Sequence, residues 1–468
     1  MALHIHDTLR GRKVKFTPRK KGEVRIYVCG PTVYDLAHIG NARPVVVFDV
    51  FIRLLRRLYP KVTYVRNITD VDDKINAAAK ESGKSIQAIT ERTTKIFHDD
   101  MAALGNLPPD HEPKATDHID GMIALTEKLL ESGNAYEAEG HVLFSVSSMD
   151  DYGKLSKLNR DDLVAGARVE VAPYKQDPAD FVLWKPSPTD DLPGWDSPWG
   201  RGRPGWHLEC SVMSEKFLGP EFDIHGGGQD LIFPHHENEI AQSTCTGGSA
   251  FAKYWMHNGY LMAEGEKMSK SLGNFYTVHE LLDEFPGEAI RLALLKTHYR
   301  QPLDFTKDGL AEAKRELDGF YSALRRSRDV EDVPLDEDDK NFANFLDALC
   351  DDLNTPLALS HLHGWAGQTN IDLSRDQHGN IVKRPRNKAM LLEMGKCLGL
   401  LGQDPEDWFK GEASEGGLGD TAIDALIAER EQARADKDFK RGDEIRDELE
   451  KNGVLLEDGA QGTTWKRG

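Results

Sequence analysis

The stretch EVRIYVCGPTVYDLAHIGNARPVVVFDVFIRLLRRLYPKVTYVRNI, residues 23–68, carries the pattern that decides the fold. Residues 23–29 alternate well enough for a strand that enters a core, and a Gly-Pro pair ends that strand. The periodic apolar stretch 45–58 predicts a helix, and residues 61–68 predict the next strand. Strand, helix and strand in this order form a βαβ unit, so we expect an α/β fold built on a doubly wound, parallel, Rossmann-like sheet.

The rest of the chain predicts further domains, because 468 residues are too many for one hydrophobic core. A glycine-rich turn at 226–228 after an apolar run indicates that the sheet resumes beyond an insertion with hairpin-like strands. The later pattern is amphipathic and helical, and an acidic, glycine-rich linker at 411–419 precedes the last unit. We therefore expect the first half of the Rossmann-like domain at 1–118, a connective insertion at 119–201, the second half at 202–250, a loop-bearing region at 251–306, a helical bundle at 307–410 and a small C-terminal domain at 420–468.

The composition is that of an ordinary soluble globular protein, with 39% hydrophobic and 29% charged residues. No apolar run approaches the roughly 20 residues that cross a bilayer, and the N-terminus lacks the apolar region of a secretion signal. The five cysteines are odd in number and scattered, which argues against a disulfide framework. We therefore expect a cytoplasmic protein without a membrane partner. The net charge of −19 favours a metabolic enzyme over a protein that binds nucleic acid through phosphates.

Two motifs combine the residue types that handle phosphate groups. HIGN, at 38–41, stands where the first strand gives way to the helix, so free N–H groups of a helix N-terminus face an anion there. Gly40 allows a close backbone approach, while the His38 imidazole and the Asn41 amide can donate hydrogen bonds to phosphate oxygens. KMSKS, at 267–271, places two lysines on a loop, where they could neutralise a triphosphate as pyrophosphate leaves. Taken alone, a histidine near a helix start is more often a cap, and an arbitrary Lys-x-x-Lys is more often a solvated charged loop, but the complete KMSKS pentad rarely occurs by chance.

Four further side chains form a candidate set of metal ligands. Cys29 ends the first strand and Cys210 lies far along the chain. His235 and Glu239 are spaced i, i+4, which places them on one face of a helix that we expect to begin near residue 234. Two thiols, one imidazole and one carboxylate match the tetrahedral donor set of zinc. A buried structural thiol is the alternative for each cysteine.

In this order, the HIGN and KMSKS motifs resemble the paired signatures of the class I aminoacyl-tRNA synthetases. The segments around Cys29, Cys210, His235 and Glu239 resemble those of the cysteinyl-tRNA synthetases, and the resemblance spans essentially the whole chain. It implies that these four residues hold one Zn²⁺ at the amino-acid pocket, where the metal favours the thiolate of cysteine over the hydroxyl of serine. Asn41 departs from the family signature, which usually ends in a second histidine; its amide carries no charge.

The resemblance also implies roles for the residues around this set. The residues that would shape the amino-acid pocket and line its floor are Thr69, Trp206, His207, His225 and His236. Those that would bind ATP, which enters with Mg²⁺, are His38, Gly40, Asn41, Gly227, Gly228, Asp230, Lys267 and Lys270. Of these, His38, Lys267 and Lys270 would act in catalysis by stabilising the phosphate charge.

Residues 435–446 and 462–466 resemble the C-terminal anticodon-binding unit of the cysteinyl enzymes. The resemblance therefore implies tRNA(Cys), ATP and L-cysteine as partners, residues 251–306 as a stem-contact region, and a monomer as the usual state. Trp465 could stack on an unpaired anticodon base, or it could anchor the unit in its own core. The sequence favours neither role.

The activity that the resemblance implies is the ligation of cysteine to tRNA. The cysteine carboxylate attacks the α-phosphate of ATP, and the terminal ribose hydroxyl of tRNA then attacks the mixed anhydride. Two alternatives remain. A ligase that passes activated cysteine to a small amine would not need the anticodon-binding unit, and a non-catalytic tRNA-binding paralogue would not need intact motifs.

Overall fold

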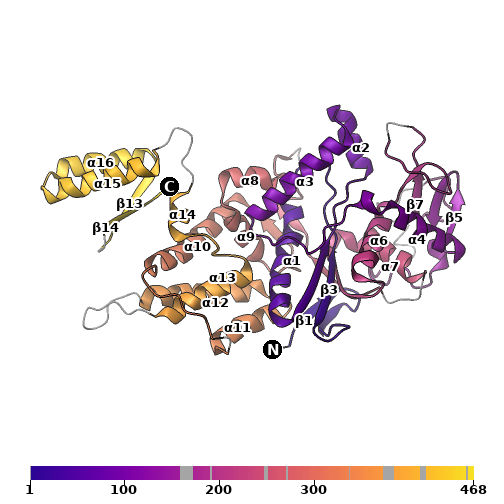
Figure 1. The fold of residues 1–468 in the computed structure, drawn as a ribbon, viewed down its shortest axis with the longest axis horizontal. Helices are drawn as coiled ribbons and strands as arrows, with labels where there is room; N and C mark the ends of the chain where they lie inside the picture. Colours follow the sequence, from indigo (N-terminus) through magenta and orange to yellow (C-terminus); the bar gives the residue numbers. More distant parts are fainter. Residues whose placement is uncertain are drawn as a thin grey trace. The chain divides into compact units, whose positions relative to one another are not determined.

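The computed structural model describes residues 2–158, 172–189, 192–246, 251–269, 272–336, 338–372, 384–411, 418–459 and 462–467. The chain divides into two compact units (Figure 1). The first comprises Met1–Lys314, Asp336–Leu362 and Lys396–Leu400, and the second comprises Arg315–Leu335, His363–Gly395 and Leu401–Gly468. The first unit thus includes part of the predicted 307–410 bundle, and the limits of that bundle stay a prediction. Among the described residues, no helix combines the length and apolar character that crossing a membrane requires.

The first unit is built on a four-stranded, fully parallel sheet in the order β10-β9-β3-β4. Its strands are β3 (Glu23–Val28), β4 (Lys61–Arg66), β9 (Phe222–Gly228) and β10 (Ala252–Asn258). β9 is buried along almost its whole length, as is typical of a parallel strand covered on both faces. From β3 the chain adds β4 on one side and later β9 and β10 on the other, so the strand order reverses between β3 and β9. The prediction of a doubly wound α/β sheet is confirmed.

Helix α1 (Ile39–Leu58) joins β3 to β4 and begins before residue 45, where the apolar periodicity starts. The start of α1 at Ile39 has a local cause. The His38 side chain accepts a hydrogen bond from the Gly40 N–H, and the Asn41 side chain accepts one from the His38 N–H, which together form a capping box. The HIGN residues are therefore the cap and first turn of the helix.

An antiparallel sheet lies between the two halves of the parallel sheet along the chain. Its order is β5 (Ala135–Ala138), β6 (His141–Phe144), β7 (Phe181–Pro186) and β8 (Gly202–Pro204), with α4 (Ile119–Glu131) before it and α6 (Trp206–Leu218) after it. One hydrophobic core runs from Phe144 and Trp184 of this sheet to Met213 of α6 and Phe222 of β9. The inserted sheet is therefore packed firmly against the elements that carry the predicted site.

Shorter elements of the first unit surround the two sheets. They are β1 (His4–Asp7), β2 (Arg12–Lys15), α2 (Asp73–Ser82), α3 (Ile86–Ala103), α7 (Glu237–Thr244), β11 (Leu261–Ala263), α8 (Val278–Glu284), α9 (Gly287–Leu295), β12 (Leu303–Phe305) and α11 (Lys340–Cys350). β11 and β12 pair in parallel, and β11 leads into the KMSKS loop. Three helices have residues in both units: α10 (Lys307–Arg326), α12 (Thr355–Asp372) and α13 (Pro385–Leu398).

The C-terminal end of the second unit has its own small core. Its elements are α14 (Pro405–Lys410), α15 (Asp420–Ala435), α16 (Phe439–Lys451) and the antiparallel pair β13 (Val454–Gly459) and β14 (Gly462–Arg467). The buried residues of this core are Ile423, Ile427, Ile445, Leu449, Val454 and Trp465.

A buried ion pair fastens α1 to α9 inside the first unit. Arg291 and Asp49 are 0% and 3% exposed and form a charged hydrogen bond. Arg291 also donates to the carbonyls of Leu398 at 2.7 Å and Leu104 at 3.2 Å, and Arg53 donates to Asp49 at 2.8 Å. Helix α1 is thus held at a fixed place by a network whose polar groups are paired.

Replacing Arg291 with alanine should lower the free energy of unfolding by about 3–5 kcal/mol, because it removes one partner of a buried ion pair. Urea unfolding followed by circular dichroism measures this loss. Lys95→Ala is the control, since Lys95 pairs with Asp99 on the surface, with 76% of its side chain exposed, and its loss should be about 0.5 kcal/mol or less. Equal losses of unfolding free energy in Arg291→Ala and Lys95→Ala would mean that Arg53 alone compensates the charge of Asp49.

Candidate active site

The predicted site residues gather at the carboxyl ends of β3 and β9. Cys29 follows β3 directly, and its N–H donates to the Gly226 carbonyl of β9 at 3.1 Å. Thr69 follows β4, and its N–H donates to the Pro31 carbonyl, also at 3.1 Å. In a doubly wound sheet, ligands bind in the crevice where the strand order reverses, which here lies between β3 and β9.

All four predicted metal ligands come together at this edge. The sulfur atoms of Cys29 and Cys210 lie 3.7 Å apart. Glu239 Oε1 lies 3.7 Å from Cys29 Sγ and 3.1 Å from His235 Nε2, and the four donor atoms all lie within 4.8 Å of one another. Metal–donor bonds of about 2.0–2.3 Å in a tetrahedral zinc site separate the donors by about 3.3–3.8 Å. The cluster therefore has the size that a cation of this kind requires.

The helix that carries Glu239 begins with an irregular turn. Helix α7 starts at Glu237, whereas His235 lies in the preceding turn at Ile232–His236. Within this turn only Phe233 has non-helical backbone angles, with φ −135° and ψ 134°, so the backbone becomes helical at Pro234, near the predicted start, and the regular α-helix follows from Glu237. The i, i+4 spacing still brings His235 and Glu239 into contact.

Burial controls the electrostatics of the cluster. Cys210, His235 and Glu239 are at most 1% exposed. Burial raises the pKa values of Cys29 and Glu239 well above their ordinary ranges and lowers the pKa of His235 well below its own. Without a cation these donors are held in their neutral forms. A bound cation stabilises the thiolate and carboxylate forms, so the donor chemistry fits a metal ion.

Two more of the predicted residues, His225 and His236, lie directly against this cluster. His225 Nε2 is 3.0 Å from Glu239 Oε2, and His236 Nε2 is 3.2 Å from Cys29 Sγ. With Cys29 and Glu239 they form a second set of possible donors, which shares two side chains with the first. The two sets therefore surround one region, and burial lowers the pKa of His225 to about 3, which keeps its imidazole neutral.

Trp206 and His207, at the start of α6, cover His235. The Trp206 ring stacks on His235 with 4.1 Å between ring centroids and remains 37% exposed. His207 Nδ1 lies 2.9 Å from His235 Nδ1, and burial lowers the pKa of His207 to about 3. Nearby, the Thr69 hydroxyl donates to Glu209 Oε2 at 2.9 Å. Trp206 and His207 are thus adjacent to the candidate metal ligands, and Thr69 is linked to Cys210 through the side chain of Asn67.

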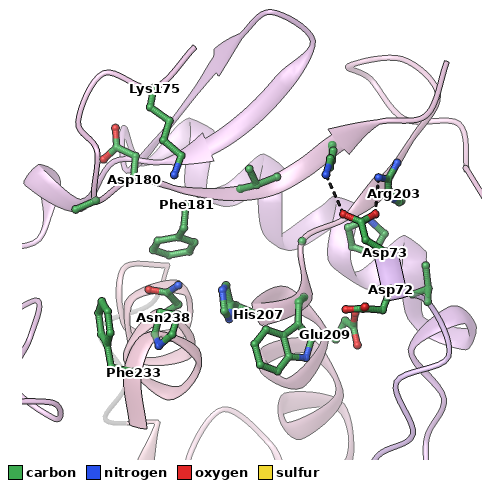
Figure 2. A pocket seen from close by; sticks show the side chains of 18 of the residues that line it. Asp72, Asp73, Lys175, Asp180, Phe181, Arg203, His207, Glu209, Phe233 and Asn238 are labelled. Carbon is green, nitrogen blue, oxygen red and sulfur yellow. Dashed lines mark hydrogen bonds and ion pairs between the residues drawn. The ribbon is translucent and has the colours of Figure 1, made fainter. Parts of the chain in front are cut away.

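A cavity of about 240 Å³ opens beside these residues (Figure 2). Phe181, from β7 of the inserted sheet, and Phe233 contribute aromatic walls, while His207 and Asn238 add polar groups. At one end Asp73 forms ion pairs with Lys185 at 2.9 Å and Arg203 at 2.7 Å. The cavity has the mixed aromatic and polar lining of a ligand site.

The N-terminus of α1 presents the first phosphate motif. His38 Nδ1 accepts from the Gly40 N–H at 3.1 Å, so a neutral His38 carries its proton on Nε2. Burial lowers the pKa of His38, against a smaller opposing effect of Asp230, and this neutral form is present near neutral pH. An Nε2–H donor at the positive end of the α1 dipole suits a phosphate oxygen, whereas the N–H groups of Ile39, Gly40 and Asn41 donate to acceptors within the chain and are not free as the sequence led us to expect.

The second phosphate motif approaches the first. The Ile39 N–H donates to the Tyr276 carbonyl at 2.9 Å, just beyond the KMSKS loop. A Cβ atom at Gly40 would lie 3.0 Å from Met268 Cε and 2.9 Å from the His38 ring, so only glycine fits here without displacing a neighbour. Lys267 is exposed on the loop, and Lys270 lies outside the described residues.

Of the remaining predicted ATP-binding residues, Gly227 and Gly228 end β9, where we expected a turn, and Asp230 follows the strand. A Cβ atom at Gly228 would lie 2.4 Å from Asp230 Oδ1, and one at Gly227 would lie 3.0 Å from the His236 ring. Asp230 interacts electrostatically with His38. Gly227, Gly228 and Asp230 therefore belong to the same edge as the first phosphate motif.

Trp465 lies apart from this site, in the core of the C-terminal elements. It is 3% exposed, and its Nε1–H donates to Asp424 Oδ1 at 2.8 Å. Stacking on an anticodon base requires an exposed face, so these contacts support the anchoring role. Phe439, at the start of α16, is 63% exposed between the exposed side chains of Lys437 and Lys440.

Three residues with clear structural roles were not predicted. Glu209 supports Thr69, Asn274 binds backbone groups of the KMSKS loop, and Phe439 is the exposed ring of the C-terminal elements. The available signals were an acidic residue directly before a candidate ligand and an aromatic residue in a Lys-Asp-Phe-Lys run. Asn274 offered no signal of its own, because its role depends on loop geometry.

Comparison with known proteins agrees with this geometry. The family model of the class I tRNA synthetase (C) catalytic domain matches residues 15–315. A DALR domain matches 344–402, and the cysteinyl-tRNA ligase anticodon-binding domain matches 419–465. The fold resembles that of methionyl-tRNA synthetase from Mycobacterium tuberculosis in complex with methionyl-adenylate, with a TM-score of 0.56 and 15% identity over 80% of this chain and 89% of that one. The sheet and the paired phosphate motifs are thus those of a class I aminoacyl-tRNA synthetase.

Relatives that match over their full length identify the particular family within this class. The cysteine–tRNA ligase of Paramagnetospirillum magneticum is 61% identical over 474 residues and covers 100% of both chains. That of Rhodospirillum rubrum is 61% identical over 470 residues, again with 100% of both chains covered. The chain belongs to the cysteine–tRNA ligase family.

Gly40→Ala should lower the rate of amino-acid-dependent ATP–pyrophosphate exchange by about ten-fold or more, because the added methyl displaces the His38 ring and Met268. The exchange is measured at saturating ATP. Gly319→Ala is the control, since Gly319 lies in α10 with no atom within 4 Å of its would-be Cβ. That variant should keep the wild-type rate and gain about 0.5–1 kcal/mol of stability. Wild-type exchange by Gly40→Ala would show that Met268 moves aside freely.

Proposed function

We propose that this chain joins L-cysteine to tRNA(Cys) in two ATP-driven steps. One observation carries the proposal: a buried cluster of two thiols, an imidazole and a carboxylate lies at the same sheet edge as two phosphate motifs, in a chain of the cysteine–tRNA ligase family. Such a cluster is suited to a substrate recognised by its sulfur, and the two motifs are suited to a triphosphate.

The cation of the cluster is Zn²⁺, held by Cys29, Cys210, His235 and Glu239. Bound zinc supplies a Lewis acid that favours the thiolate of substrate cysteine over the hydroxyl of serine. Around the zinc ion, side chains of this protein form the walls and floor of the amino-acid pocket. Trp206, which is stacked on His235, and Thr69, anchored on Glu209, form the walls of the pocket. His207, His225 and His236 line its floor as neutral imidazoles.

In the first step, a carboxylate oxygen of cysteine attacks the α-phosphorus of ATP, and pyrophosphate leaves with the electrons of the broken P–O bond. His38 donates its Nε2–H to a phosphate oxygen, and Gly40 and Asn41 bind the phosphates at the N-terminus of α1. Lys267 and Lys270 neutralise the charge on the leaving group, as does Mg²⁺ bound to ATP. Gly227, Gly228 and Asp230 hold the adenosine.

In the second step, a hydroxyl of the terminal ribose of tRNA attacks the carbonyl carbon of cysteinyl-adenylate, and AMP leaves. That ribose must reach the amino-acid pocket. The cavity beside Trp206 and His207 provides the space, with the rings of Phe181 and Phe233 available to stack on a nucleobase.

The cellular compartment, the oligomeric state and the type of acceptor complete the proposal. All five cysteines are free thiols, which suits the reducing cytoplasm. We propose a monomer on the resemblance to the family alone. The match of residues 419–465 to an anticodon-binding domain counts against a ligase that uses a small amine as acceptor, and the intact cluster counts against a non-catalytic paralogue.

Two assays on the zinc-loaded, full-length protein test the function. Cysteine-dependent ATP–pyrophosphate exchange reports the first step, and charging of tRNA(Cys) reports the second. Both should be present. Exchange without charging would indicate a small-amine ligase, and the absence of both in a folded, zinc-loaded sample would refute the proposal.

Cys210→Ser should lose bound zinc and, with it, about a hundred-fold or more of the preference for cysteine over serine, because a hydroxyl is a far weaker zinc ligand than a thiolate. Metal content and the ratio of kcat/KM values measure the two effects. Cys350→Ser is the control, since Cys350 is a buried thiol of α11 that takes no part in the cluster. Unchanged metal content in Cys210→Ser would show that Cys210 is a buried structural thiol and not a zinc ligand.

Phe439→Ala should lower kcat/KM for tRNA charging by about five- to hundred-fold, because stacking of a base on an aromatic ring is worth roughly 1–3 kcal/mol. Exchange should stay at the wild-type rate, since it needs no tRNA. Leu455→Ala is the control, because Leu455 is 41% exposed in the same C-terminal elements but has no ring. Unaltered charging by Phe439→Ala would rule out this stacking contact.

A further inference from the structure

Arg43, near the start of α1, is a buried cation whose partners are backbone carbonyls. Its Nη1 donates to the carbonyls of Gly259 at 2.8 Å and Tyr260 at 2.6 Å, and its Nη2 donates to that of Gln301 at 2.7 Å. The side chain is 0% exposed. Within the described part of the chain, no carboxylate is paired with it.

This arrangement is costly if stability is its only purpose. Burial lowers the pKa of Arg43 to about 10, with no acidic group to offset the loss of water. A packed apolar side chain often serves stability as well as a buried charge does. A planar guanidinium, in contrast, holds several acceptors in one fixed geometry. What Arg43 supplies is therefore a defined position for the groups that it binds.

The bound carbonyls belong to both chain segments that enter the β11–β12 pair. Gly259 and Tyr260 join β10 to β11, and Gln301 lies just before β12. Since β11 leads directly into the KMSKS loop, Arg43 ties the base of that loop to α1. The N-terminus of the same helix carries His38.

The described part of the KMSKS loop is hydrogen-bonded to this base. The buried side chain of Asn274 accepts from the Ser269 N–H at 2.8 Å and donates to the Ala263 carbonyl at 2.9 Å. Beyond the loop, the hydrogen bond from Ile39 to Tyr276 makes a second attachment to α1. The loop is therefore attached to α1 on both sides, and Arg43 is the attachment at its base.

We propose that Arg43 is a positioning residue for the adenylation step: its guanidinium sets the place of the Lys267 loop relative to the phosphate-binding N-terminus of α1. The inference rests on the proposed function, because it assigns Lys267 to the triphosphate. Arg43 acts through the loop and touches no reacting atom.

Two variants test this role. Arg43→Lys keeps the charge on a single nitrogen that cannot span both segments, and Arg43→Gln removes the charge, so the test survives if one of them fails to fold. Both should lower kcat for cysteine-dependent ATP–pyrophosphate exchange by about ten- to hundred-fold, since a displacement of about 1 Å is enough for such a loss. The KM for cysteine and the zinc content should stay within about two-fold of wild type.

Arg53→Lys is the matched control. Arg53 lies on the same helix and also donates to carbonyls, those of Gly105 at 2.8 Å and Lys396 at 3.2 Å, which do not belong to the loop. This variant should lower the thermal midpoint without lowering the exchange rate.

Single-turnover transfer from preformed cysteinyl-adenylate to tRNA(Cys) separates positioning from general damage. This step involves no triphosphate, so the Arg43 variants should keep the wild-type transfer rate. Wild-type exchange by Arg43→Lys, or equal losses in both steps, would overturn the proposal. Absent exchange in the wild-type protein would instead contradict the proposed function.

Discussion

The reversal of strand order between β3 and β9 is the constraint on which the site depends. Because all four strands are parallel, their carboxyl ends share one edge, and the reversal leaves a crevice between the two central strands. The backbone hydrogen bond from Cys29 to Gly226 spans this crevice. The candidate metal cluster, the turn with Asp230 and the N-terminus of α1 lie at the same edge, so one feature of topology unites groups that are far apart in the chain.

The two ends of the crevice differ in burial and therefore in the kind of group that they can bind. The cluster is almost fully buried, and burial favours the neutral forms of its thiols, carboxylate and imidazole unless a bound cation stabilises the charged forms. The phosphate side is built differently, from the positive end of a helix dipole, a neutral His38 and the exposed Lys267. A small substrate that binds by its sulfur suits the buried end, and a large, highly charged nucleotide suits the exposed end.

Much of this could be predicted from the sequence, and most of what could not depends on contacts between segments that are distant in the chain. Periodicity was enough for the parallel sheet, whereas the residue types alone gave the four candidate metal ligands only moderate support before the family resemblance, because no pair of them except His235 and Glu239 is closely spaced. The helix N-terminus expected at HIGN is found there, but the capping box of His38 and Asn41 that fixes it leaves no trace in apolar periodicity. The burial of Trp465 and the partners of Arg43 depend on segments distant in sequence, so no local pattern contains them.

The strand order also has a consequence for biosynthesis. β3 ends at Val28 and its inner neighbour β9 begins at Phe222, about 190 residues later, which takes about 10–40 s at ribosomal speeds of about 5–20 residues per second. Until then one edge of β3 has no partner, and Cys29 stands beside it as a single thiol. The inserted sheet is synthesised during this interval, so the nascent chain carries an unpaired strand edge and a free thiol before either can reach its place in the site.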